Sequence, residues 1–207
     1  MAERWTEMNL VPTAPRRPVN LAIDLLRPLI HDVLSGYWEA WFYSMYMDDD
    51  PEHPDILRLR VLWRTSERDA GYEKLTDFLN DDEIRAKLDD CYEGSHGERN
   101  QVYPGEADKF GSDMWPTTYR NWMSGSEMAL TILTLLSQGA PFKMPAEEHW
   151  AYRVHMFSNA LGLGYTGEAE LSLIRAQGYL EPRSDDRSKA IVKAIKEYFG
   201  EEPKIAR

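Results

Sequence analysis

The stretch DILRLRVLWR, residues 55–64, limits the fold more than any other part of the chain. Apolar residues alternate with other residues over most of it, and a period of two is typical of a β-strand. As a strand, it places Arg58 and Arg60 on one face, about 6.6 Å apart. The opposite face is wholly apolar, with Leu57, Leu59, Val61 and Trp63. The apolar face therefore needs a hydrophobic layer, and the arginine face needs an anion.

The nature of that anion has two interpretations. Two guanidinium groups this close repel each other unless an anion lies near both, and a guanidinium can bind a carboxylate through two parallel N–H donors. The chain carries 35 Asp and Glu residues against 24 Lys and Arg residues, so an acid on a neighbouring strand can supply the charge. The alternative is an anion-binding pocket on an exposed face of the sheet. The sequence leaves both open.

Strand signals lie in the first half of the chain. The aromatic run YWEAWFYSMYM, residues 37–47, and the arginine strand predict a hairpin joined by the acidic turn DDDPEHPD. WTEMNL near the N-terminus predicts a short strand, and residues 98–113 predict a strand that passes into a loop. Between them, VNLAIDLLRPLIHDVLSG predicts a helix that ends at Gly36, with Pro28 as the expected position of a kink.

Helix signals dominate the second half. The stripe of Leu75, Phe78, Leu79, Ile84 and Leu88 predicts two short helices over residues 69–92. Further helices are expected at 124–139, 145–164, 167–180 and 186–200. This order predicts an α+β fold, in which a small antiparallel sheet in the N-terminal half packs against a mainly helical C-terminal half. We expect an arm at residues 1–18, the main domain at 19–183, and a C-terminal helix and tail at 184–207.

Composition excludes several classes of function. A formal net charge of −11 opposes binding to nucleic acid and to anionic membranes. Cys91 is the single cysteine, which excludes an internal disulfide and a thiolate metal cage. The chain has no dinucleotide or phosphate-loop fingerprint, so we expect neither a metal nor an organic cofactor. Without a signal peptide or a long apolar stretch, a cytoplasmic protein that does not enter the membrane is expected.

Two further stretches contain candidate site residues. The loop YPGEADKFG, residues 103–111, combines Tyr103, Glu106 and Lys109 between turn-forming residues, and functional groups often lie on such loops. In the predicted helix 145–164, His155 and Asn159 are four residues apart, so they share a face with Tyr152. Each stretch has an ordinary structural explanation as well, as a surface loop and as a helix with a structural histidine.

Taken in order, these motifs resemble a known family. An aromatic strand, an acidic turn, an L-R-L-R strand, the Tyr103–Gly111 loop and H-M-x-x-N on a late helix resemble the C-terminal domain of nisin-type lanthipeptide dehydratases. Standalone relatives occur in thiopeptide pathways as glutamate-elimination proteins or as pyridine-forming cyclases. The resemblance covers roughly residues 20–183.

The resemblance implies a reaction and its residues. Elimination members act on a precursor peptide whose Ser or Thr has been esterified with glutamate by a separate tRNA-dependent protein or domain. They remove the Cα proton and expel glutamate, which leaves a dehydroamino acid. The implied catalytic residues are Arg58, Arg60, Glu106, Lys109 and His155, and the implied substrate-binding residues are Tyr103, Trp115, Tyr119, Tyr152 and Asn159.

These residue types suit the implied chemistry. Removing a proton beside a carbonyl builds enolate charge, which positioned donors must stabilise. The two arginines would hold carboxylates of the departing glutamate. His155 would act as the base, or as the acid for the leaving group, and Glu106 would orient a cation.

Two alternatives follow from departures from the family pattern. Ile56 stands where elimination members usually have a histidine, and Lys109-Phe110 stands where they have Arg-Tyr. A pyridine-forming cyclase needs instead an aromatic cleft, for which Trp115, Tyr119, Trp122, Trp150 and Tyr152 are candidates, although a place in the core is the more usual explanation for each of them. The other alternative is a non-catalytic partner that binds a basic peptide, as an added strand at a free sheet edge.

Overall fold

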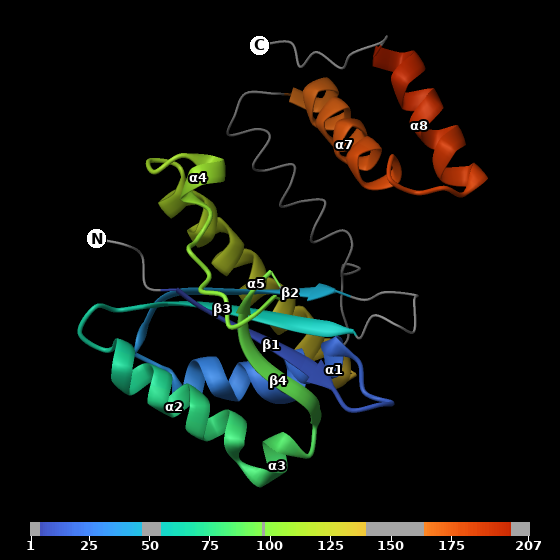
Figure 1. Cartoon of the computed structure of the whole chain (residues 1–207). Coiled ribbons are helices and arrows are strands. Elements are labelled where there is room, and N and C mark those ends of the chain that lie inside the picture. The colour runs from blue at the N-terminus through green and yellow to red at the C-terminus, as the bar shows by residue number, and fades with distance from the viewer. Residues whose placement is uncertain (1–4, 47–54, 97, 140–163, 200–207) are drawn as a thin grey trace. The chain divides into compact units, whose positions relative to one another are not determined.

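The computed structural model describes residues 5–46, 55–96, 98–139 and 164–199 (Figure 1). Residues 1–141 and 142–207 form two compact units, and each is described by itself. Strands lie in the first half of the chain and long helices in the second, which confirms the predicted α+β class. In the first unit the elements are β1 (Trp5–Pro12), α1 (Pro18–Leu21), the π-helical η1 (Ala22–Leu26) and η2 (Leu29–Val33), β2 (Trp38–Tyr46), β3 (Ile56–Trp63), α2 (Arg68–Asn80), α3 (Asp82–Arg85), β4 (Leu88–Ser95), β5 (Glu98–Arg99), α4 (Ala107–Phe110) and α5 (Trp115–Ser137). The second unit contains α7 (Gly164–Leu180) and α8 (Asp186–Phe199).

The sheet has the strand order β2-β3-β1-β4-β5, and every neighbouring pair is antiparallel. The predicted hairpin of residues 37–47 and 55–64 is confirmed by the β2–β3 pairing, which aligns Phe42 with Arg60. Residues 5–12 lie within the segment expected to be an arm, but they form β1, the middle strand, and all of them are buried. β1 aligns Glu7 with Arg60 and Asn9 with Arg58.

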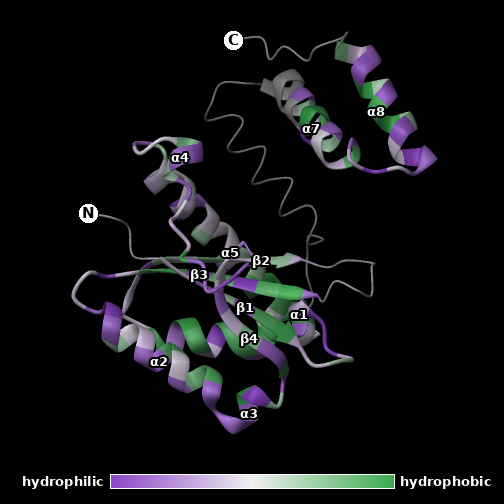
Figure 2. Ribbon diagram, viewed as in Figure 1, coloured by the Kyte–Doolittle hydropathy of each residue, from purple (hydrophilic) through white to green (hydrophobic). Residues whose placement is uncertain are grey.

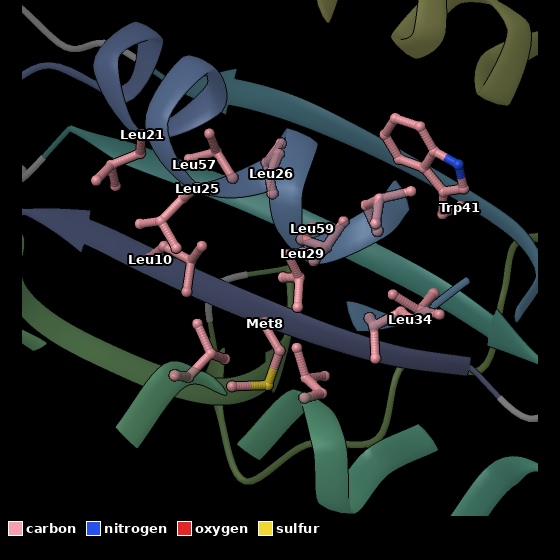
Figure 3. Close-up of a cluster of buried hydrophobic side chains, with 14 of the residues drawn as sticks. Met8, Leu10, Leu21, Leu25, Leu26, Leu29, Leu34, Trp41, Leu57 and Leu59 are labelled. Carbon is pink, nitrogen blue, oxygen red and sulfur yellow. The ribbon is translucent and has the colours of Figure 1, made fainter. Parts of the chain in front are cut away.

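One face of the sheet carries the main hydrophobic core. Leu57 and Leu59 of β3 and Leu10 of β1 lie against the helical segment of residues 18–33, as Figure 3 shows. Met8 of β1 belongs to the same buried cluster. The helical segment contributes the buried side chains of Leu21, Leu25, Leu26, Leu29 and Ile30, and Leu34 directly after it belongs to the same cluster. In Figure 2 the helical segment beside α1 is largely hydrophobic, whereas α2 and α3 carry many hydrophilic residues. The apolar face of the arginine strand therefore has the layer that its sequence requires.

The predicted helix over residues 19–36 is present, but its winding is irregular. It begins with Pro18 at the first helical position, where a missing N–H costs nothing. η1 and η2 lie on either side of Pro28, where the ring prevents a normal backbone hydrogen bond. The chain leaves the helix through Gly36, whose φ of +90° is readily adopted only by glycine.

The other face of the sheet has a second, aromatic cluster. Trp5, Phe42 and Leu62 contribute from the strands, and Tyr103, Trp115 and Tyr119 cover them. α5 also runs beside β2, where the Ser126 hydroxyl accepts the Tyr43 backbone N–H at 3.1 Å. This contact occupies part of the outer edge of β2.

Several predicted boundaries are wrong. Residues 88–92 belong to β4 and not to a helix, because Cys91 pairs with Leu10 of β1. The strand predicted in residues 98–113 is reduced to the two residues of β5, and α4 follows it. α5 begins nine residues before the predicted helix 124–139, while α7 and α8 agree closely with prediction. The predicted helix 145–164 lies outside the described residues except for its last position.

Candidate functional site

Arg58 and Arg60 share one carboxylate from the neighbouring strand. Arg60 Nε donates to Glu7 Oε2 at 2.7 Å, and Arg58 Nε lies 3.2 Å from Glu7 Oε1. The Glu7 side chain is fully buried, and the two arginine side chains are 8% and 6% exposed. The interpretation in which an acid on an adjacent strand faces both arginines therefore describes this pair. Glu7 supplies one negative charge for the two positive charges of the arginines.

Asn9 holds the second guanidinium from the same strand. Its Oδ1 accepts the Arg58 Nε–H at 3.0 Å, and its Nδ2 donates to the Gly94 carbonyl at 3.4 Å. Because this N–H points at Asn9, the contact between Arg58 and Glu7 Oε1 is electrostatic and not a hydrogen bond. The alternation of Glu7 and Asn9 on β1 thus matches the alternation of arginines on β3.

Aromatic rings lie against both guanidinium groups. Arg58 Cζ is 4.3 Å from the ring centroid of Tyr46, and Arg60 Cζ is 4.7 Å from that of Tyr103 and 5.3 Å from that of Phe42. A cation is attracted to the face of an aromatic ring, more strongly where water is excluded. These rings help to keep the cations buried without neutralising them.

The contacts described so far leave the Nη donors of Arg58 and Arg60, and part of their positive charge, available for a ligand. The contacts with described residues engage Nε of each arginine, and within that part of the chain no hydrogen bond or ion pair reaches the Nη groups. A guanidinium presents its donors in a rigid fork, so fixing Nε also fixes the direction of the Nη donors. Among the described residues, two guanidinium groups and one carboxylate leave a single surplus positive charge at the pair.

The loop of residues 103–111 lies next to this pair. The Tyr103 hydroxyl donates to Glu106 Oε1 at 3.1 Å, and Lys109 Nζ lies 3.5 Å from Glu106 Oε2. Burial raises the pKa of the Tyr103 phenol well above its usual range, although Arg60 acts in the opposite direction. Tyr103 therefore stays protonated and remains a donor. The structure brings together five predicted site residues: Arg58, Arg60, Tyr103, Glu106 and Lys109.

The other predicted site residues divide into two groups. Trp115 and Tyr119 are 1% and 3% exposed, and their rings lie 5.7 and 5.4 Å from that of Trp5. This burial supports the alternative that they belong to the core. His155, Tyr152 and Asn159 lie outside the described residues, as does Trp150. The predicted roles of these residues stay predictions.

Glu7 and Asn9 were not among the predicted site residues, although a signal for them exists. In WTEMNL, Trp5, Glu7 and Asn9 occupy alternate positions, which places them on one face of a strand. Recognising their role requires knowing that β1 pairs with β3, and pairing partners are a property of the folded chain.

Two large cavities lined by described residues lie away from the arginine pair. One, of about 770 Å³, lies between residues 23–32 and α5, where His31 Nε2 is 3.3 Å from Glu127 Oε2. Another, of about 710 Å³, lies against α8 and is lined mainly by charged residues, including Arg183, Lys189 and Lys193.

Comparison with known proteins places the fold in a wider context. A sequence model of the family described as "Lantibiotic biosynthesis dehydratase C-term" matches residues 5–206. No curated protein matches the chain. The tRNA-dependent lantibiotic dehydratase MibB from Microbispora sp. 107891 has a similar structure, with a TM-score of 0.53 and 20% sequence identity. The match covers 70% of this chain but 13% of MibB, so it shows a shared fold alone.

Two further solved structures are less similar to this chain. TsrL gives a TM-score of 0.44 at 17% identity, over 96% of this chain and 56% of TsrL. A putative antibiotic biosynthesis monooxygenase from Chloroflexus aurantiacus J-10-fl gives 0.23 at 19% identity, over 45% of this chain and 96% of that protein. This chain therefore spans a small part of MibB and about half of TsrL.

Proposed function

The chain belongs to the family of lantibiotic biosynthesis dehydratase C-terminal domains, and from this premise we propose that it eliminates glutamate from glutamylated Ser or Thr in a precursor peptide. The product is a dehydroamino acid within that peptide. Family membership supports the general role, which is modification of a ribosomally made peptide in lantibiotic-type biosynthesis. The site geometry supports the specific reaction.

The observation that carries the proposal is the surplus positive charge of the arginine pair. When glutamate is esterified through one carboxyl group, its other carboxyl group remains a free anion. Arg58 and Arg60 are held through Nε, so their Nη groups are oriented as donors for such a carboxylate. Their burial strengthens this attraction, because charges interact more strongly where water is excluded.

The reaction moves one proton and one electron pair. A base removes the Cα proton of the esterified residue, the C=C bond forms, and the Cβ–O bond breaks so that glutamate leaves as a carboxylate. We assign the base to His155. Tyr103 is unsuited to that role because its raised pKa keeps it protonated. It is instead a positioned donor, anchored to Glu106 beside Arg60.

The two alternatives have less support from the geometry. A cyclase would use an aromatic cleft, but Trp115 and Tyr119 pack in the buried cluster around Trp5. A peptide-binding partner would use a free sheet edge, but the backbone N–H of Cys91 on β4 donates to Asp90 Oδ1 at 2.8 Å. Each of these contacts removes part of the surface that the alternative needs.

The test follows the mass of a glutamylated peptide that is incubated with the protein. Loss of glutamic acid is expected. Arg58→Lys and Arg60→Lys should each slow it by about 100-fold or more, because lysine cannot form two parallel hydrogen bonds. Arg64→Lys is the matched control, since Arg64 follows β3 directly and donates through Nε to the Trp38 carbonyl at an exposed position.

Three results would contradict the proposal. Wild-type protein that leaves the glutamylated peptide unchanged would exclude elimination. Full activity in both lysine variants would exclude the arginine clamp. Loss of water and leader from a peptide that carries two dehydroalanines would instead identify a cyclase.

A further inference from the structure

We propose that Glu7 is a specificity-determining residue, which fixes the charge of the arginine pair so that it accepts an anion with one carboxylate in preference to one with two. The inference rests on the proposed function of the pair as an anion site. It assigns a role to a residue of β1 that the predicted site did not include.

The first support is the position of Glu7. Its side chain is fully buried between two guanidinium groups, and its strand is the middle strand of the sheet. The carboxylate faces both arginines, and of the two it accepts a hydrogen bond from Arg60. It therefore lowers the positive charge of the pair while the Nη groups keep their donors.

The second support is the charge of the surroundings. Glu106 and Lys109 form an ion pair with each other, at 3.5 Å, and add no net charge. Asn9, Tyr46, Phe42 and Tyr103 also contact the guanidinium groups, and they are neutral. The surplus of one positive charge is thus decided by Glu7. Among the described residues, a second carboxylate on a ligand would meet no further unpaired positive charge beside the pair.

The third support is that two substitutions, Glu7→Gln and Asn9→Asp, change the charge at the pair while they barely change the shape of the side chain. Glu7→Gln replaces a carboxylate by an amide and raises the surplus to two positive charges. Asn9→Asp makes the reverse change beside Arg58 Nε and brings the surplus to zero. Neighbouring charges act strongly on buried ions, so the two substitutions should shift anion affinity in opposite directions.

The test measures binding of glutarate and glutaramate by calorimetry at pH 7. These probes have the same length, but glutarate has two carboxylates and glutaramate has one carboxylate and one amide. The wild-type protein should bind glutaramate at least as tightly as glutarate. Glu7→Gln should raise the affinity for glutarate relative to glutaramate by about tenfold, and Asn9→Asp should weaken both by about tenfold or more.

A control and a folding measurement accompany the series. Asn80→Asp adds the same charge at an exposed position at the end of α2, and it should leave both affinities unchanged. Glu7→Gln leaves two buried cations without a carboxylate, so it can fail to fold. Asn9→Asp pairs two cations with two anions, and circular dichroism should show that it folds while it loses anion binding.

The outcomes separate this inference from the proposed function. If the wild-type protein binds neither probe, the arginine pair is not an anion site and the proposed function loses its main support. If it binds glutarate more tightly than glutaramate, Glu7 does not set a preference for one carboxylate. If folded Asn9→Asp binds both probes as the wild type does, the charge balance does not control binding and the inference is overturned.

Discussion

Tyr43, Cys91 and Tyr103 show how burial controls single ionisable side chains. Burial raises the pKa of Tyr43 to about 12 and that of Cys91 to about 11, and it raises the pKa of Tyr103 still further above its ordinary value. In each case, removal of water penalises the charged form. All three groups are neutral at pH 7, so none of them serves as a nucleophile or a base.

Cys91 should react slowly with alkylating reagents. With a pKa of about 11, about a hundredth as much of the thiol is ionised at pH 8 as in a cysteine with the ordinary value of 9.0. We therefore expect iodoacetamide to label the native protein about 100-fold more slowly than the protein unfolded in urea. Mass spectrometry over time measures both rates. Equal rates would show that the thiol is accessible and ionised in the folded chain.

Tyr43 should contribute to loss of stability at alkaline pH. Its folded pKa is raised, so its favourable contribution is complete below pH 10 and is lost as pH rises from 10 toward 12. Tyr43→Phe should reduce the loss of unfolding free energy between pH 8 and pH 11 by roughly 1 kcal/mol.

Urea unfolding of both proteins at the two pH values measures this difference. At pH 8 the variant should be at least as stable as the wild type, because the buried hydroxyl has no hydrogen-bond partner among the described residues. If Tyr43→Phe lost as much unfolding free energy between pH 8 and pH 11 as the wild type, Tyr43 would ionise freely in the folded state.

Helices and strands with a clear hydrophobic periodicity could be predicted from the sequence. Elements that form because they pair with a distant segment could not. The alternation in residues 55–64 predicts β3, and the apolar spacing of residues 19–36 predicts the helical segment, although not its π-helical turns beside Pro28. Leu88 fits the stripe of the preceding helices, so β4 is visible only once β1 is known to pair with it.

The same limit applies to the candidate site. The strand of Arg58 and Arg60, and the loop of Tyr103, Glu106 and Lys109, have local patterns that could be recognised in the sequence. That the loop folds over Arg60 depends on packing between segments about 40 residues apart, and the burial of Trp115 beside Trp5 depends on packing between segments about 110 residues apart. Glu7 lies about 50 residues from its arginines, and only strand register reveals it.

The helix α2 packs against the sheet without space for a methyl group at Gly71. A Cβ there would lie 2.6 Å from Trp63 Cζ3, and Trp63 is itself buried. Gly71→Ala should therefore destabilise the protein by roughly 1–3 kcal/mol, despite the better helix propensity of alanine. Thermal unfolding followed by circular dichroism measures the effect.

Gly178→Ala in α7 is the matched control. No atom lies within 4 Å of a Cβ at Gly178, so only the gain in helix propensity remains, and α7 should be stabilised by up to about 1 kcal/mol. If both substitutions changed the unfolding temperature in the same direction, close packing would not be the reason that α2 has a glycine.

Charge is the dominant property of the whole molecule. The net charge is −11, and the acids outnumber the bases by the same margin over the full sequence. Among the described residues, no helix combines the length and the apolar character needed to cross a bilayer. Within this acidic chain the arginine pair is a local exception, and it is buried.

The acidic surface should prevent binding to tRNA. Two polyanions repel each other, and binding to nucleic acid normally requires release of counterions from phosphates by cationic side chains. We expect no retention of labelled tRNA in a filter-binding assay at about 0.15 M salt. Retention that weakens steeply with salt would contradict this, and it would direct attention to the basic residues along α8, such as Lys189 and Lys193.

The middle position of β1 has a consequence for synthesis on the ribosome. β1 leaves the exit tunnel before both of its partners, since Trp5 pairs with Leu62 and Met8 pairs with Glu93. Until residue 95 has emerged, at least one edge of this strand has no partner, and such an edge is prone to pair with other chains. Nascent chains halted before that point should therefore depend on chaperones, whereas in chains halted after it β1 should be paired on both of its edges.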